Sequence, residues 1–387
     1  MRILFASNFP NDELQNIGEG KKSLMDNNNF FLFPLIDFFL GKNNRITILS
    51  TSRSIKKNIV YIRGQLKIVI VALFSHGRVS ALLDFKNDIK RIENAICEEE
   101  YDIYHAHWCY EYAKACLNIN PERTLITVHD WPDKVCPLVG NFYWKKRNKL
   151  GNTVLCEGKR FTAVSPYIKE LVEEYNVNAE VDMIPNYSLG DTNRDESEML
   201  HKHDSFIVIT VCNGFGGIKN TQKAIKAFVH FHDMNSNCEL QMYGDDYGKG
   251  EAAERWALKN GVNIEGIHFV GRVGRKQLEE AYENADVLLH TSREESFGLI
   301  YLEAMEHKTA ILAGKDSGAT PWVLEYGKCA CLVDINDEED ILKGMIKVCN
   351  DAEYRDLIVK NGRRRLKEFQ KDCIFEQYRK TYNRIVK

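Results

Sequence analysis

The chain has 387 residues, of which 44% are hydrophobic and 28% charged, and its formal net charge at pH 7 is −3. This length predicts two domains rather than one core, and the small net charge gives no general reason to expect a nucleic acid as a partner. No segment approaches the roughly 20 apolar residues that a membrane-spanning helix needs. The eleven cysteines lack metal-binding spacing, so we expect reduced thiols in the cytoplasm.

The first half of the chain alternates between apolar runs and stretches with helical spacing, which is typical of an α/β domain. Residues 1–7 predict a first strand rather than a signal peptide, and residues 8–19 predict a polar loop. Further strands are predicted at 46–50, twice within 55–79 with a turn near Gly64, at 101–108, at 124–131, at the start of 160–175 and at 182–188. Helices are predicted at 23–41, at 81–99 and from Ser165 and Pro166 onward, where Ser165 is the expected N-cap residue.

Two of these strands end in histidine motifs. YDIYHAHW, residues 101–108, carries His105 and His107, and TLITVHDW, residues 124–131, ends in His129 and Asp130. Ligands of open α/β sheets bind at the carboxyl ends of the strands. The motifs alone allow either a structural or a functional role for these histidines.

Residues 140–160, GNFYWKKRNKLGNTVLCEGKR, combine three aromatic residues with a cluster of Lys and Arg and a single acidic residue. The segment is either a solvated loop or helix face, or an amphipathic patch that contacts anionic lipid. The second interpretation predicts peripheral contact with the inner face of the membrane.

A polar, poorly periodic segment at residues 189–204 predicts the boundary between two domains, at 1–190 and 204–373. SFIVITVCNG, residues 205–214, predicts the first strand of the second domain. Later strands are predicted at 238–246, 267–273, 287–290 and 330–334 and at the start of 308–327, and helices at 275–285, 299–305, 337–350, 354–371 and 374–387.

The loop after the strand at 205–214 carries Gly214, Gly216 and Gly217, and Lys219 precedes the next helix. These glycines permit a ligand to approach the backbone closely, although they do not form the GxGxxG fingerprint of dinucleotide binding. A cation at the position of Lys219 can neutralise the charge that develops on a departing phosphate.

Residues 285–305, ADVLLHTSREESFGLIYLEAM, predict a buried strand, a polar loop and a helix that begins near Gly298. The free N–H groups and the dipole at such a helix start favour an anion. Glu295 in the loop and Glu303 in the helix are either solvated surface carboxylates or ligands for hydroxyl groups beside that anion.

The stretch EESFGLIYLEAM resembles the signature of retaining glycosyltransferases of family four. The resemblance implies the GT-B fold, in which two Rossmann-like α/β domains have parallel sheets that face a central cleft. It implies that Glu295 contacts the donor sugar and that Glu303 binds the ribose hydroxyls of the nucleotide. The donor-binding residues that we expect are Gly18, Gly214, Lys219, Arg272, Glu295, Ser296, Phe297, Gly298, Leu299 and Glu303.

Further roles follow from the same resemblance. His129 matches the family histidine that faces the donor sugar, and Gly18 matches a glycine-rich loop near the donor phosphates, with a plain turn as the alternative. An Arg that relatives carry about five residues before the Lys is replaced here by Asn213 or Gly214, and Arg293 is a candidate substitute. The helix at 374–387 is expected to return to the first domain.

The implied catalytic residues are Glu295, His129 and Lys219, and no two Asp residues form the Asp-x-Asp motif of metal-dependent relatives. We therefore predict no metal and no cofactor, with a nucleotide-diphosphate sugar as substrate. The predicted function is retaining transfer of a hexosyl or acetylhexosaminyl group to a glycan or lipid-linked saccharide in capsule, exopolysaccharide or O-antigen synthesis. Another GT-B nucleotide-sugar enzyme, such as an epimerase, and a non-catalytic nucleotide-sugar-binding protein are the alternatives.

Overall fold

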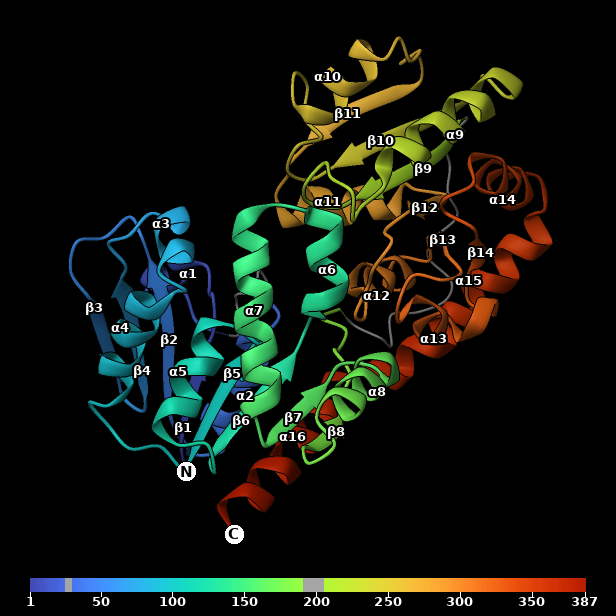
Figure 1. Cartoon of the computed structure of the whole chain (residues 1–387). Helices are drawn as coiled ribbons and strands as arrows, with labels where there is room; N and C mark the ends of the chain where they lie inside the picture. Colours follow the sequence, from blue (N-terminus) through green and yellow to red (C-terminus); the bar gives the residue numbers. More distant parts are fainter. Residues whose placement is uncertain (25–29, 191–204) are drawn as a thin grey trace. The chain divides into compact units, whose positions relative to one another are not determined.

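The computed structural model describes residues 1–24, 30–190 and 205–387. These residues divide by their contacts into unit 1, Met1–Pro185 with Lys371–Lys387, and unit 2, Asn186–Gln370. Each unit is built on one sheet with helices on both faces (Figure 1). The predicted boundary at 189–204 lies almost wholly outside the described residues, so the predicted domain limits stay a prediction.

The sheet of unit 1 has eight strands in the order β3-β4-β2-β1-β5-β6-β7-β8. Its neighbours are parallel except for the edge strand β3, which forms an antiparallel hairpin with β4 across Gly64. The central strands β5 and β6 are buried along their whole length, and β1 is buried except at Arg2, as their apolar runs predict. The strands are β1 Arg2–Ala6, β2 Arg45–Ser52, β3 Ile59–Arg63, β4 Leu66–Ala72, β5 Ile103–His107, β6 Thr124–Val128, β7 Arg160–Ala163 and β8 Glu180–Met183.

Helices cover both faces of this sheet, with α4, α5 and α7 on one face and α2 and α16 on the other (Figure 1). Ser165 caps α8, as predicted, because its side chain accepts a hydrogen bond from the Ile168 N–H. The helices are α1 Asn11–Gly18, α2 Phe33–Gly41, α3 Gly77–Leu82, α4 Lys86–Ile96, α5 Glu111–Ile119, α6 Pro132–Val139, α7 Phe142–Glu157, α8 Pro166–Tyr175 and α16 Lys371–Val386.

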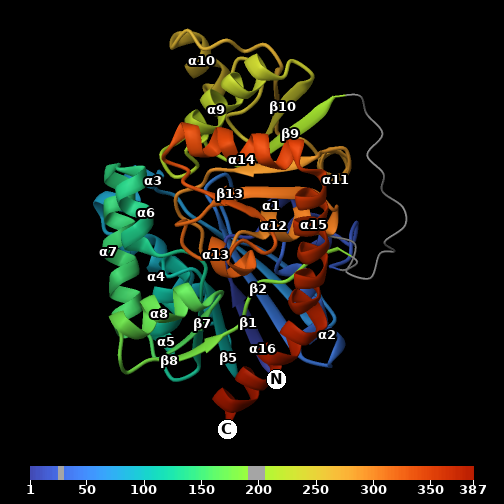
Figure 2. The ribbon, with the colours of Figure 1, turned by 90° about the vertical axis from the view of Figure 1, so that its right-hand side faces the viewer.

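The late helix α16 belongs to unit 1 and packs beside α2 (Figure 2). The Tyr382 ring stacks on Phe39 with 4.7 Å between ring centroids, and the Tyr382 hydroxyl lies 2.6 Å from His105 Nδ1 on β5. These contacts bury the inner face of α16 against the sheet.

Unit 2 has a fully parallel six-stranded sheet in the order β11-β10-β9-β12-β13-β14. Helices α9 and α14 pack together on one face, where α14 lies over β13 (Figure 2), and α12 and α15 cover the other. Its strands are β9 Phe206–Val211, β10 Cys238–Tyr243, β11 Ile267–Gly271, β12 Val287–His290, β13 Ala310–Gly314 and β14 Cys331–Val333. Its helices are α9 Thr221–Met234, α10 Ala252–Lys259, α11 Arg275–Glu283, α12 Leu299–Glu306, α13 Thr320–Val323, α14 Glu338–Asn350 and α15 Ala352–Leu366, with short 3₁₀ turns at Glu325–Gly327 and Lys367–Phe369.

Several predicted elements were wrong in detail. Residues 11–18 form helix α1 instead of a loop, and the helix predicted from residue 23 begins at Phe33, where Pro34 fits the first turn; residues 25–29 of that prediction lie outside the described residues. The single helix predicted at 81–99 is divided into α3 and α4, because Asp84 and Phe85 adopt positive φ angles of 49° and 58°. Helices α5, α6 and α10 were not predicted.

Candidate functional site

The candidate site of unit 2 is built on the turn between β12 and α12. The chain enters α12 through Gly298, whose φ is +86°. This left-handed conformation is unfavourable for residues with a side chain, and a Cβ at this position would lie 2.4 Å from the ring of Tyr301. Glycine therefore lets the helix start at the carboxyl edge of the sheet, where its free N–H groups favour an anion.

Hydrogen bonds between two loops hold Lys219 next to this turn. The Thr291 hydroxyl donates to the Lys219 carbonyl at 3.0 Å, and the Arg293 N–H donates to the Ile218 carbonyl at 2.7 Å. The Arg293 guanidinium also donates to the Gly217 carbonyl at 2.7 Å. Because β9 and β12 are neighbours in the sheet, the backbone itself brings the two predicted motifs together.

A lysine, a glutamate and a histidine meet between these loops. Lys219 Nζ lies 2.8 Å from Glu295 Oε1, and His290 Nε2 lies 2.9 Å from the same oxygen. The exposed fractions of the side chains are 26% for Lys219, 14% for Glu295 and 4% for His290. The predicted residues Lys219 and Glu295 thus form one charged cluster that still contacts solvent.

The electrostatics of this cluster keep Glu295 ionised. Burial favours the neutral carboxyl, but the Lys219 ammonium and the His290 ring outweigh burial and hold the pKa of Glu295 well below its usual range. Burial likewise opposes the charge on Lys219, yet Glu295 raises the pKa of that ammonium. For His290, burial prevails and lowers the pKa, so a neutral ring donates its Nε2–H to the carboxylate.

His290 is a site residue that the sequence reasoning missed, since it was assigned only to the end of a buried strand. Its position as the last residue of β12, five residues before Glu295, was the available signal. A side chain at the end of a parallel strand lies at the edge where ligands bind.

The residues between Glu295 and α12 differ in what they can offer a ligand. The side chain of Phe297 is buried against Trp322 and Phe369, with centroid distances of 6.3 Å and 5.3 Å. Only the backbone of Phe297 is therefore suited to contact a donor. Ser296 and Leu299 are partly exposed.

Glu303 lies within the first turns of α12 and is partly buried. Its carboxylate accepts a hydrogen bond from the Tyr282 hydroxyl of α11 at 3.1 Å. Burial raises the pKa of Glu303, and the charge of Arg275 opposes that rise only in part. Its assignment to ribose hydroxyls stays a prediction.

Gly214 and Arg272, which were also predicted to contact the donor, both lie next to Asp245 in the turn after β10. Gly214 has a φ of +84°, and its N–H already donates to the Asp245 carbonyl at 3.1 Å. Arg272 is exposed and lies 3.4 Å from Asp245 Oδ2, a surface pair that contributes little to stability. Arg293, the candidate substitute for the missing phosphate contact, is held by the loop carbonyls described above and by Asn336 Oδ1 at 3.1 Å.

The prediction that Gly18 lies in a loop was wrong. Gly18 is the last residue of α1, and a Cβ there would lie 2.4 Å from the ring of Tyr61 on β3. Glycine at this position allows helix and strand to pack closely, and the approach of Gly18 to the donor phosphates stays a prediction.

The predicted histidines of unit 1 have different environments. His105 is enclosed between Tyr382 and Thr127, and burial lowers its pKa to about 3, which makes it structural. His107 Nδ1 lies 2.9 Å from His129 Nε2, and burial lowers the pKa of His129 to about 3. Both rings of this pair are therefore neutral at pH 7, and the contact of His129 with a donor sugar stays a prediction.

Most of the aromatic and basic segment at 140–160 forms helix α7. Arg147 does not extend freely into solvent, because its guanidinium lies 3.9 Å above the Tyr110 ring and 3.5 Å from Glu111. Lys146 pairs with Asp84 at 2.7 Å. Part of the predicted lipid-binding charge is thus used within the protein.

Two features are absent from residues 1–24, 30–190 and 205–387. In this part of the chain no group of three or more His, Cys, Asp or Glu side chains is arranged to hold a metal ion. No helix there is both long and apolar enough to cross a membrane.

Known proteins resemble the chain in sequence and in fold. The profile of glycosyl transferases group 1 matches residues 191–365, and that of glycosyltransferase family 4 matches residues 39–187. An uncharacterized glycosyltransferase of Methanocaldococcus jannaschii is 22% identical over 77% of this chain and 80% of its own length. The lipopolysaccharide 1,2-N-acetylglucosaminetransferase of Salmonella typhimurium is 24% identical over 55% of this chain and 57% of its own. Sucrose-phosphate synthase from Thermosynechococcus elongatus has a similar fold, with a TM-score of 0.73 at 15% identity over 100% of this chain and 99% of that one.

Proposed function

Because the chain belongs to the glycosyl transferases group 1 and has the GT-B fold, we propose that it transfers a hexosyl or acetylhexosaminyl group from a nucleotide-diphosphate sugar to a saccharide, with retention of configuration and without a metal. The observation that carries this proposal is the contact between Lys219 and Glu295 beside the N-terminus of α12. At this place a cation and the helix N–H groups can bind a diphosphate, and the neighbouring carboxylate can bind a sugar.

In the proposed reaction, the bond between C1 of the donor sugar and the diphosphate oxygen breaks, and the diphosphate leaves with the bonding electrons. The acceptor hydroxyl oxygen bonds to C1 from the same face, and its proton passes to the departing phosphate. Lys219 and the N–H groups of α12 neutralise the charge that develops on the diphosphate. Glu295 remains a carboxylate and stabilises positive charge on the sugar ring, so it does not serve as the proton donor.

Lys219 would supply the positive charge that a metal ion supplies in other transferases. Its ammonium is fixed by the loop contacts before the reaction, which avoids reorganisation as charge develops. In this proposal Glu303 binds the ribose hydroxyls, and the backbone from Ser296 to Leu299 holds the diphosphate.

Cell-surface polysaccharide or glycolipid synthesis is the pathway that we propose. The Salmonella relative is named for a lipopolysaccharide transferase, and a capsular polysaccharide biosynthesis glycosyltransferase of Staphylococcus aureus is 28% identical over 27% of this chain. All eleven cysteines are free thiols, which supports a reducing compartment. We place the protein in the cytoplasm, at the inner face of the membrane.

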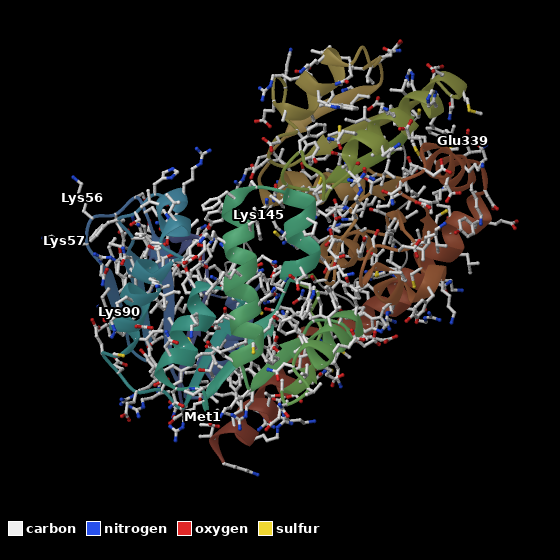
Figure 3. The ribbon with its side chains drawn as sticks, in the orientation of Figure 1. Met1, Lys56, Lys57, Lys90, Lys145 and Glu339 are labelled. Carbon is white, nitrogen blue, oxygen red and sulfur yellow. The ribbon has the colours of Figure 1, made fainter. Side chains whose placement is uncertain are left out.

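Peripheral membrane contact is supported by a surface of unit 1 that we call the α3 surface, made of Val79, Leu82, Leu83 and Phe142. These four apolar side chains are exposed, and α3 packs against α7. Lys145 lies on α7 (Figure 3) and is exposed, as are two more basic residues of this region, Arg78 and Lys86. Exposed apolar groups beside cations suit an anionic lipid surface.

The test of the transfer reaction is incubation with a panel of nucleotide sugars, with and without oligosaccharide acceptors, while released nucleotide diphosphate and product are measured. We expect release that chelation of divalent metals leaves unchanged. Lys219→Met should lower turnover by roughly two orders of magnitude, the effect of removing one fixed charge stabiliser. Lys226→Met is the matched control, because Lys226 lies on α9 and pairs with Glu338 outside the site.

Three outcomes would contradict the proposal. A near-normal rate in Lys219→Met would remove the role of this lysine. A free epimerised sugar formed without acceptor would favour the epimerase alternative. Binding of nucleotide sugars with neither hydrolysis nor transfer would favour a non-catalytic protein.

A further inference from the structure

Unit 1 contains a pocket of about 620 Å³ whose lining comes entirely from that unit. It opens at the carboxyl ends of β5 and β6, where ligands of such sheets bind. Aromatic side chains from three segments line it, among them Trp108, Tyr110 and Trp144. Flat aromatic faces with a few polar groups between them are typical of a site for a small organic ligand.

The backbone at Trp108 supports a binding role for the pocket. Trp108 has a φ of +64°, a conformation that is rare and costly for a bulky residue. Its ring lies 4.7 Å from that of His129, and its N–H donates to the Thr127 carbonyl at 2.9 Å. The surrounding contacts thus hold the indole beside the pocket at a cost in conformational energy.

Four polar atoms of the lining have no hydrogen-bond partner within the described part of the chain: Asn11 Oδ1, His107 Nε2, Asp130 Oδ1 and Arg147 Nε. His107 is only 1% exposed. Buried polar atoms in native proteins almost always have a partner. Donors and acceptors gathered in this way around one pocket suit a ligand that itself carries several hydroxyl groups.

The charges of the lining disfavour an anionic ligand. Both lining guanidinium groups already have a carboxylate neighbour, Arg53 with Asp88 at 2.6 Å and Arg147 with Glu111 at 3.5 Å. The third carboxylate, Asp130, has only the Tyr110 hydroxyl, at 3.0 Å, as a described partner. Burial also raises the pKa of Asp130 to about 6, and a phosphate placed beside this carboxylate would repel it further.

We propose that this pocket binds the acceptor of the transfer reaction, and that the end of the acceptor inside it is a sugar ring without phosphate or carboxylate, either uncharged or bearing an amino group. The inference rests on the proposed function, since it is that reaction that requires an acceptor. Hydroxyl groups would satisfy the four unpaired atoms, and the ring faces would pack on the indoles.

The test is saturation-transfer NMR on the full chain with four sets of probes: hexoses and N-acetylhexosamines, hexosamines, hexose 6-phosphates and hexuronates. We expect signal from the first two sets and none from the last two. Trp144→Ala and Asp130→Asn should abolish the signal, and Trp144→Phe should retain it. Asp133→Asn is the control, because Asp133 accepts hydrogen bonds from Asn148 and Asn152 but does not line the pocket.

The outcomes separate this inference from the proposed function. Binding of only the phosphate or carboxylate probes, binding of none of the probes, or an unchanged signal in both pocket variants would overturn the inference. Thermal shifts with nucleotide diphosphates, recorded on the same variants, verify that unit 2 remains folded and binds its ligand. Saccharide binding by a protein that never turns over a nucleotide sugar would leave the assignment of the pocket to an uncharged or amino sugar intact and refute the transferase proposal.

Discussion

Glu295 and Glu303 belong to one short segment of the chain, yet their surroundings move their pKa values in opposite directions. Burial acts on both, but only Glu295 has an ammonium group at 2.8 Å to outweigh it. A permanent charge suits Glu295 to a sugar that becomes positive during transfer. Glu303, bonded to the Tyr282 hydroxyl, is suited to accept hydrogen bonds from neutral hydroxyl groups.

The depressed pKa of Glu295 predicts a pH dependence of stability. The unfolded carboxyl titrates near 4.5 and the folded one well below, so its ionisation stabilises the fold above that pH and is lost as the pH falls. The difference in unfolding free energy between wild type and Glu295→Gln should therefore be largest above pH 4.5 and shrink below it, by up to about 1.4 kcal/mol per pH unit. Urea unfolding of both proteins from about pH 7 to about pH 3 measures this difference.

The control for this measurement is Glu339→Gln, because Glu339 lies on the surface of α14 with 82% of its side chain exposed (Figure 3). Its substitution should change the unfolding free energy little, because an exposed ion pair contributes little to stability. A Glu295→Gln difference that stays constant across the range would show that Glu295 titrates as in the unfolded chain.

At single positions, Lys219 and Glu295 could be predicted as site residues because each lies in a loop that follows a predicted strand. Loops that follow the strands of a parallel sheet lie at the same edge of that sheet. It did not reveal His290, whose apolar neighbours in β12 are those of any buried strand. It also gave Gly18 the wrong surroundings, because the close contact with Tyr61 joins residues 43 positions apart in the sequence.

Among the elements, the turn from β12 into α12 depends on its glycine. Replacing Gly298 with Ala places a side chain in a left-handed conformation and against the Tyr301 ring. We expect a loss of about 1–3 kcal/mol in unfolding free energy, together with weaker nucleotide-diphosphate binding because the start of α12 must shift. Urea unfolding and calorimetric titration with nucleotide diphosphates measure the two effects.

Gly274→Ala serves as the comparison. Gly274 precedes α11 in an extended conformation, and a Cβ there would meet no atom within 4 Å, so both stability and binding should be close to wild type. Unaltered nucleotide binding in Gly298→Ala would argue against an anion at the start of α12.

Most strands could be predicted, since buried parallel strands are continuous apolar runs, as in β6 and β12. Short helices were harder to predict. In α1 only Leu14 and Ile17 are buried, and in α10 only Ala253 and Ala257, which is too few apolar positions for a helical period to be recognised. The break between α3 and α4 depends on positive φ angles at Asp84 and Phe85, which are uncommon for residues other than glycine.

For the whole protein, the proposed membrane contact predicts binding to vesicles that contain anionic lipid. Leu82→Glu with Leu83→Glu should abolish this binding by placing negative charge on the α3 surface, and added salt should weaken it. Val177→Glu is the matched control, because Val177 is an exposed apolar residue of unit 1 in the loop after α8. Cosedimentation with phosphatidylglycerol and phosphatidylcholine vesicles measures the effect, and equal binding to both lipids or by all variants would refute it.

The α/β class and the GT-B fold could be predicted because the order of strands and helices and one motif carry that information. The acceptor pocket could not, because its lining comes from residues between Asn8 and Arg147 in many separate segments. The lipid interpretation of residues 140–160 had grouped Trp144 and Arg147 with the surface, whereas both line that pocket.

The place of α16 in unit 1 has a consequence for biosynthesis. His105 and its partner Tyr382 are 277 residues apart in the sequence, so a ribosome makes all of unit 2 after β5 and before the helix that covers it. Until α16 has been synthesised, one face of the sheet in unit 1 stays incompletely covered. Apolar surface exposed in this way can bind chaperones or lead to misassembly. The unit that begins folding first is thus the last to be completed.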